Sequence, residues 1–185
     1  MKPGVRVTGG EHRGRGLAVP PGARPTEGRV REALFSMWAD RLEGARVLDL
    51  CAGSGVVGLE AMGRGALSAL LVDEDLRAIK ILEANLALLG EKTVAIRRLT
   101  LPGGLGRLVA EGAGPFDLVY VDPPYTFQPY EALIAGLAPL LAADAEVVVE
   151  HASRRDLPVQ AGSLVRTDTR KYGEGSLSFY RVGPE

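Results

Sequence analysis

The chain has 185 residues, of which 46% are hydrophobic and 24% are charged, as is typical of one folded α/β domain with a small appendage. Its apolar runs fall short of the ~20 residues that cross a bilayer, and residues 1–16 lack the apolar stretch of a secretory signal, so we expect a cytoplasmic protein with no membrane partner. The single cysteine, Cys51, excludes an internal disulfide, and because His12 and His151 lie far apart we expect no metal site.

The formal net charge of −1 is unevenly distributed along the chain. Residues 1–31 carry seven basic and two acidic side chains, a net charge of +5, which leaves −6 on the remainder. A basic arm on an acidic catalytic body is typical of proteins that bind nucleic-acid phosphates. A solvated terminal tail would show the same charge pattern.

Residues 1–25 are rich in glycine, proline and arginine, with short β-like pieces at 5–8 and 17–19. This pattern predicts a small N-terminal hairpin arm, followed by a domain over residues 26–185. Thr26 is a candidate N-cap for a helix that runs to about Arg41 and places Val30, Leu34 and either Met37 or Trp38 on one face.

From residue 46 onward, strand and helix patterns alternate, which predicts a mostly parallel sheet covered by helices. The chain closes with two β-like segments around Gly173-Glu174-Gly175, which predict an antiparallel hairpin at one edge. The fold class is therefore a Rossmann-like α/β sheet with a small N-terminal extension. The expected strands are 46–50, 68–73, 93–97, 116–121 and 146–150, the helices are 55–64, 75–89, 101–111 and 130–142, and the closing hairpin joins 164–171 to 176–181.

A glycine loop, Gly53-x-Gly55-x-x-Gly58, lies between the first strand of this series and its helix. It matches the dinucleotide fingerprint, and Asp73 follows Gly53 by 20 residues, where a ribose-binding acid is expected. Asp49 at the end of the first strand argues against a pyrophosphate and favours a cationic ligand. S-adenosylmethionine carries an ammonium and a sulfonium, and Asp49 could attract the ammonium directly or order the loop and waters around it.

A second motif, Asp122-Pro123-Pro124-Tyr125, follows the fourth strand of the series. In a doubly wound sheet, strands one and four are neighbours at the switch point where ligands bind. The Asp122 carboxylate and the Pro123 carbonyl can accept the two N–H bonds of an exocyclic base amine, and Tyr125 can stack on an extruded base. These residues therefore predict methyl transfer to a base amine, although the same tetrapeptide also forms turns.

Together these motifs resemble the class I amino-group methyltransferases. More narrowly, the chain resembles the bacterial 16S ribosomal RNA guanine-N2 methyltransferases of the RsmD type almost from end to end. The segments that carry this resemblance are 7–10, 13–15, 24–26, 29–35, 49–60, 122–125 and 171–173, among which Arg24-Pro25-Thr26 with Arg29–Phe35 is the most diagnostic.

The resemblance implies a Rossmann-like methyltransferase fold, S-adenosylmethionine as donor without a metal, and 16S rRNA or the small ribosomal subunit as partner. Two departures stand out: Asp73 replaces a more usual glutamate, and residues 97–100 lack the acid often found near the adenine. The positions implied for the donor are Asp49, Ala52, Gly53, Ser54, Gly55 and Asp73; those for catalysis are Asp122, Pro123 and Tyr125; and those for RNA phosphates are Arg13, Arg15, Arg24 and Arg29.

Three other functions stay open at this point. An adenine-N6 DNA methyltransferase shares the second motif, a nicotinamide-dependent oxidoreductase shares the glycine loop, and a non-catalytic RNA-binding assembly factor would explain the basic arm. The last of these leaves Asp122–Tyr125 without a role.

Overall fold

The computed structural model describes residues 4–23 and 27–184. The chain forms two compact units, residues 1–98 and residues 99–185. The donor-site residues expected from the sequence fall in the first unit, and Asp122–Tyr125 fall in the second.

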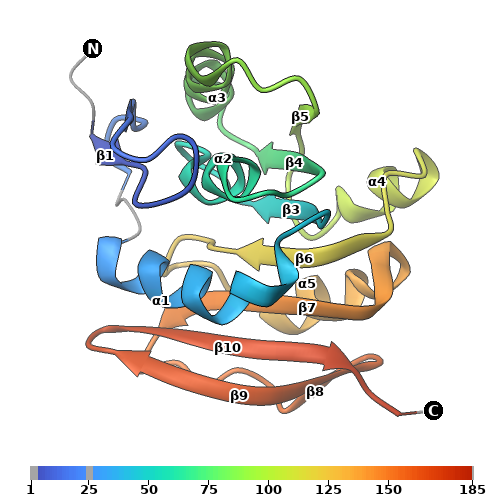
Figure 1. Cartoon of the computed structure of the whole chain (residues 1–185). Helices are drawn as coiled ribbons and strands as arrows, with labels where there is room; N and C mark the ends of the chain where they lie inside the picture. Colours follow the sequence, from blue (N-terminus) through green and yellow to red (C-terminus); the bar gives the residue numbers. More distant parts are fainter. Residues whose placement is uncertain (1–3, 24–26, 185) are drawn as a thin grey trace. The chain divides into compact units, whose positions relative to one another are not determined.

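The first unit begins with the predicted hairpin (Figure 1), in which β1 (Val5–Arg6) pairs antiparallel with β2 (Gly16–Leu17). Helix α1 (Gly28–Trp38) follows and continues into a 3-10 turn, η1 (Ala39–Arg41). Glu27 occupies the N-cap position without a side-chain hydrogen bond, whereas Thr26, the N-cap expected from the sequence, lies outside the described residues. The predicted positions Val30, Leu34 and Trp38 of α1 are almost inaccessible to solvent, as is Phe35, whereas Met37 is half-buried.

Parallel strands form the centre of the first unit. Strand β4 (Ser68–Asp73) lies between β3 (Arg46–Leu50) and β5 (Val94–Arg98), and Asp49 is in register with Leu71. Helix α2 (Val56–Gly63) packs on β3 and β4, and helix α3 (Leu76–Leu89) packs on β4 and β5. Helix α3 begins where Asp75 accepts a hydrogen bond from the Arg77 N–H and ends at Gly90, whose φ of 73° suits glycine.

The second unit combines a parallel pair with antiparallel strands. Strand β6 (Phe116–Val121) runs parallel to β7 (Leu141–Ala152). On its other side β7 pairs antiparallel with β10 (Gly175–Val182), which pairs antiparallel with β9 (Leu164–Tyr172), and β9 in turn pairs antiparallel with β8 (Gln160–Ala161). Its helical elements are α4 (Leu105–Ala110), α5 (Tyr130–Gly136) and the 3-10 turn η2 (Ala138–Leu140). The closing hairpin is therefore confirmed as β9 and β10.

Three predicted elements in this unit have wrong bounds, and one strand was not predicted. The helix expected over 130–142 ends at Gly136, because Leu141 already pairs with Phe116 at the start of a strand longer than the 146–150 predicted. The helix expected over 101–111 begins only at Leu105, and the short strand β8 was not predicted at all. Within the described parts of both units, we find no helix with the length and apolar character needed to cross a membrane.

Candidate active site

The glycine loop leaves the carboxyl end of β3 through a series of left-handed residues. Cys51 has a φ of 59°, Gly53 a φ of 59°, and Gly55, the N-cap of α2, a φ of 77°. Left-handed backbone costs roughly 1–2 kcal/mol at a residue with a side chain, so the conformation of Cys51 is strained. The turn joins the end of β3 to the start of α2 within the five residues 51–55, and a turn of this kind was expected from the glycine pattern.

Two carboxylates hold this loop through its backbone. The Gly58 N–H donates to Asp49 Oδ2 at 3.0 Å, and the Gly53 N–H donates to Asp73 Oδ2 at 3.0 Å. The other oxygen of Asp73, Oδ1, accepts from the Asp75 N–H at 3.0 Å. Both acids predicted at strand ends therefore accept hydrogen bonds from the backbone of the loop motif.

The glycines of the loop have different tasks. A Cβ at Gly55 would lie 2.7 Å from Leu82 Cδ2, and a Cβ at Gly58 would collide with Leu71, so these two allow close packing of α2. A Cβ at Gly53 would meet no atom within 4 Å, so its backbone borders open space. A ligand can approach the loop at Gly53, which is the fit that a donor at this position requires.

Burial strongly perturbs Asp49. Its side chain is 2% exposed, and desolvation raises the carboxyl pKa to about 8, opposed by the Gly58 N–H and assisted by the charge of Asp73. A buried carboxyl with this pKa is mostly protonated at neutral pH, and a cation placed beside it would restore the ionised form. The site therefore favours a ligand with positive charge over one that carries a pyrophosphate.

The remaining loop residues are bound into the first unit. The Ala52 N–H donates to the Val72 carbonyl at 2.9 Å. Ser54 is buried: its Oγ accepts from the Val56 N–H at 3.3 Å, and its carbonyl accepts from Asn85 Nδ2 at 2.8 Å. Ala52 and Ser54 shape the backbone of the loop through these bonds.

The second motif follows β6 directly. Asp122 is half-buried, Pro123 is buried and Tyr125 is half-buried, and the Phe127 N–H closes a turn on the Pro124 carbonyl at 2.8 Å. A Cβ at Gly175 would lie 3.3 Å from the Tyr125 hydroxyl oxygen. The glycine of the closing hairpin thus allows Tyr125 its position.

A buried acid lies close to the same point. Glu150 Oε1 would be 3.8 Å from a Cβ at Gly175, and Glu150 Oε2 accepts a hydrogen bond from the Tyr120 hydroxyl. Sequence reasoning did not single out Glu150 or Tyr120. Both lie in strands of mostly apolar sequence, and the polar residue within each apolar run was the signal that the sequence offered.

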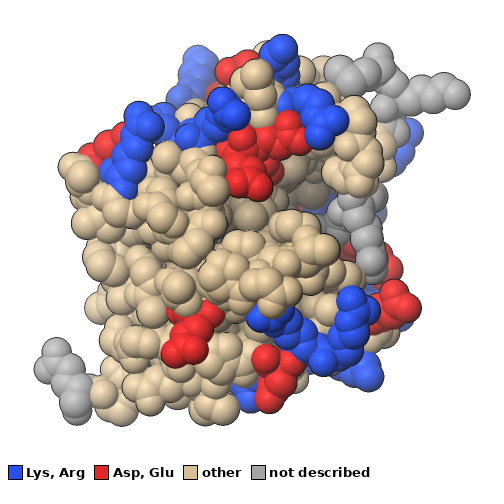
Figure 2. All heavy atoms as spheres, turned by 180° about the vertical axis from the view of Figure 1, so that it is seen from behind, with Lys and Arg blue, Asp and Glu red and all other residues tan. Residues whose placement is uncertain are grey.

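Those basic residues expected to contact RNA that the structure describes lie at the surface. Arg13, Arg15 and Arg29 are exposed, and Arg24 lies outside the described residues. Arg15 also donates from Nη2 to the Leu88 carbonyl at 3.1 Å, so it is partly committed to α3. On the face shown in Figure 2, basic side chains are interspersed with acidic ones.

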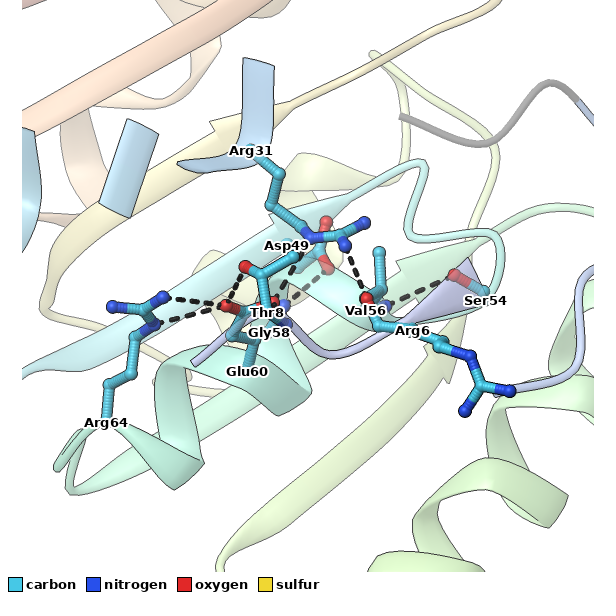
Figure 3. Close-up of polar contacts among 9 residues, drawn as sticks. All are labelled: Arg6, Thr8, Arg31, Asp49, Ser54, Val56, Gly58, Glu60 and Arg64. Atoms are coloured by element: carbon cyan, nitrogen blue, oxygen red, sulfur yellow. Dashed lines mark hydrogen bonds and ion pairs between the residues drawn. The ribbon is translucent and has the colours of Figure 1, made fainter. Parts of the chain in front are cut away.

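A buried ionic cluster that the sequence analysis missed surrounds Glu60 on α2 (Figure 3). Glu60 is inaccessible to solvent, and it binds Arg31 Nε at 3.1 Å and Arg64 Nη2 at 2.9 Å. Thr8 adds its N–H at 3.1 Å and its hydroxyl at 2.6 Å. Arg31 also donates to the Arg6 carbonyl, so α1, α2 and the hairpin meet at one carboxylate. A lone acid inside the apolar helix 56–63 was the sequence signal for this cluster.

Comparisons with known proteins identify a matching family and relatives that are named as rRNA methyltransferases. A family model described as "Conserved hypothetical protein 95" matches residues 5–181. The chain is 39% identical over 158 residues to "Ribosomal RNA small subunit methyltransferase D" of Escherichia coli (strain K12), covering 83% of this chain and 78% of that protein. It is 34% identical over 182 residues to "Putative rRNA methyltransferase YlbH" of Bacillus subtilis (strain 168), covering 96% and 98% of the two chains.

Among solved structures, "Putative methyltransferase yhhF from Escherichia coli" superimposes with a TM-score of 0.81 at 32% identity. The match covers 98% of this chain and 99% of that chain. The likeness confirms the Rossmann-like methyltransferase fold expected from the sequence.

Proposed function

Because the chain belongs to the family described as Conserved hypothetical protein 95, we propose that it is an S-adenosylmethionine-dependent methyltransferase of ribosomal RNA. We infer that the acceptor is the exocyclic N2 amine of a guanine in 16S rRNA, presented as free RNA or within the small ribosomal subunit in the cytoplasm. The named relatives support the reaction, and the residues of the two motifs support the chemistry.

The observation that carries the proposal is one glycine motif held by two strand-end acids, with the buried Asp49 bound to Gly58 and Asp73 bound to Gly53, whose backbone borders open space. S-adenosylmethionine supplies an electrophilic methyl group on a sulfonium, which is a good leaving group. Asp49 in its ionised form stabilises the positive charge of the donor and holds Gly58, while the carboxylate of Asp73 accepts hydrogen bonds from the ribose hydroxyls and holds Gly53.

Asp122, Pro123 and Tyr125 are assigned to the acceptor base. The Asp122 carboxylate and the Pro123 carbonyl accept the two N–H bonds of the amine, which directs its lone pair at the methyl carbon. The Tyr125 ring offers a stacking surface worth roughly 1–3 kcal/mol per base. Transfer forms an N–C bond, breaks the S–C bond, and releases one proton from the amine, which Asp122 can accept. Positioning supplies most of the rate.

We assign residues 1–25 to RNA binding, with Arg13, Arg15 and Arg24 as phosphate contacts, and we add Arg29 on α1 as a fourth contact. The exposure of Arg13, Arg15 and Arg29 supports this role. Such contacts supply affinity that falls with salt and does not depend on sequence.

Transfer of a labelled methyl group to small-subunit rRNA that lacks the modification tests the proposal. We expect transfer by the wild type, none by Asp122→Ala, and normal transfer by Asp144→Ala, which changes an exposed acid of β7 in the same unit. Mass spectrometry of the labelled nucleoside separates N2-methylguanosine from N6-methyladenosine. Absence of transfer by the wild type to both rRNA and 30S subunits would refute the proposal.

The oxidoreductase alternative is tested by calorimetry. We expect the wild type to bind S-adenosylhomocysteine and not NAD, because the ammonium of S-adenosylhomocysteine stabilises the ionised form of Asp49 and a pyrophosphate does not. Binding of NAD alone would favour hydride transfer.

A further inference from the structure

Asn85 is the only asparagine in the sequence, and it lies on α3 with 2% of its surface exposed. Asparagine is a poor helix former, and a buried amide destabilises a protein unless its polar atoms are hydrogen-bonded. The neighbouring buried positions of α3, which include Ile81 and Leu82, carry apolar residues. An amide at this position therefore has partners that an apolar side chain could not serve.

Those partners belong to two segments far apart in the sequence. Asn85 Oδ1 accepts from the Ala18 N–H at 2.9 Å, and Nδ2 donates to the Ala18 carbonyl at 2.9 Å. Nδ2 also donates to the Ser54 carbonyl at 2.8 Å. One side chain thus pairs with the backbone just after β2 and with the backbone of the glycine loop.

The hairpin is also attached to α2, the helix that follows the glycine loop. Glu60 on α2 accepts both the N–H and the hydroxyl of Thr8, as Figure 3 shows. The segment from Thr8 to Ala18 is therefore held at both ends, by α2 and by α3. Arg13 and Arg15 lie between these two attachments.

We propose that Asn85 is a positioning residue for the methyl donor, because it clamps the Ser54 carbonyl of the donor loop to the N-terminal hairpin. The inference rests on the proposed function and deepens it. Donor affinity then depends on the hairpin even without RNA. By linkage, RNA that engages Arg13 and Arg15 raises donor affinity by the same factor by which the donor raises RNA affinity.

Calorimetry with S-adenosylhomocysteine, without RNA, tests the clamp. Asn85→Leu removes all three hydrogen bonds and leaves the Ser54 and Ala18 carbonyls unpaired, so we expect roughly tenfold weaker binding. Asn85→Asp keeps the acceptor for the Ala18 N–H but loses both donor bonds, and we expect weakening of the same order. Ile81→Ala, on the same helix, lowers thermal stability without removing these bonds and should leave the dissociation constant unchanged.

Hydrogen exchange on the wild type gives a second readout that does not depend on a variant folding. Saturation with S-adenosylhomocysteine should slow exchange at the hairpin amides of Val7 and Gly14, which donate within the hairpin, as well as in the glycine loop. In Asn85→Asp, the slowing in the hairpin should be lost while the slowing in the loop remains.

Two outcomes overturn the clamp: Asn85→Leu and Ile81→Ala binding the ligand equally well, or ligand slowing exchange in the loop with no change in the hairpin. Failure of the wild type to bind S-adenosylhomocysteine at all is a different result, and it would refute the proposed donor.

Discussion

Donor binding should be linked to the protonation of Asp49. The pKa of this carboxyl is raised to about 8 in the unliganded protein because the side chain is desolvated, so the acid is protonated below that pH. A cationic donor favours the ionised form, and each pH unit below 8 then costs about 1.36 kcal/mol, or tenfold in affinity. We expect S-adenosylhomocysteine to bind about tenfold more weakly at pH 6.0 than at pH 7.0, with release of close to one proton.

Calorimetry in two buffers of different ionisation enthalpy measures both the affinity and the released proton. The amino group of the ligand is that of a free amino acid, which is more basic than a peptide N-terminus, so it stays protonated over this range. Asn at position 49 cannot release a proton, and Asp49→Asn should bind weakly with an affinity that is flat between pH 6.0 and 7.0. A wild-type affinity equally flat, with no proton released, would refute the assignment of Asp49 to the donor's charge.

The same substitution should stabilise the unliganded protein. Because the folded pKa is raised from 3.8, the destabilisation by Asp49 is absent below pH 3.8, grows as the pH rises, and is complete above about 8. At pH 7 it amounts to about 4 kcal/mol. Asp49→Asn retains an oxygen for the Gly58 N–H, so its free energy of unfolding in urea should exceed that of the wild type at pH 7 and match it near pH 4.

Three further predictions concern the loop, the ionic cluster and the closing hairpin. Glu60→Ala leaves Arg31 buried without its carboxylate and should lower the free energy of unfolding in urea by about 3–5 kcal/mol. Gly53→Ala adds a methyl group to the open side of the loop at a φ of 59°, so calorimetry should show weaker donor binding, with a stability loss of only about 1 kcal/mol. Gly175→Val should displace the Tyr125 hydroxyl and raise KM for RNA in the methyl-transfer assay without changing donor affinity.

Matched variants control for general effects on folding. Glu60→Gln keeps an oxygen acceptor for Arg31 and should be less destabilising than Glu60→Ala. Gly173→Ala lies in the same hairpin as Gly175, has no atom within 4 Å of its Cβ, and should leave KM for RNA unchanged despite its φ of 64°. Equal KM values for Gly175→Val and the wild type would contradict the role given to Gly175, and unchanged stability of Glu60→Ala would contradict the importance of the cluster.

The sequence predicted the elements whose local signals agree with their packing. The strands 68–73 and 116–121 were predicted with their observed bounds because polar or turn residues limit each mostly apolar run: Ser68 and Asp73 end the first, and Pro115 and Asp122 flank the second. Residues 141–145 carry good helix formers, yet they extend β7, because Leu141 pairs with Phe116 across the parallel sheet. Tertiary pairing outweighs intrinsic propensity there.

In the candidate site, too, the sequence located some residues and could not predict the partners of others. Asp49, Asp73 and Asp122 could be located because each follows or ends a strand, where ligands of open α/β sheets gather. The partners of Glu60 and Asn85 could not, because Thr8 and Ala18 lie 52 and 67 residues away in sequence. Contacts of that kind require the folded chain, and periodicity within one helix carries no information about them.

The double use of Asp73 bears on how the ligand would be received. Each carboxylate oxygen has a second lone pair after its bond to Gly53 or Asp75, so two ribose hydroxyls can be accommodated while both backbone bonds persist. The loop is therefore preorganised for the ligand. Little conformational freedom then remains to be lost at this loop on association, and more of the gross interaction energy survives as affinity.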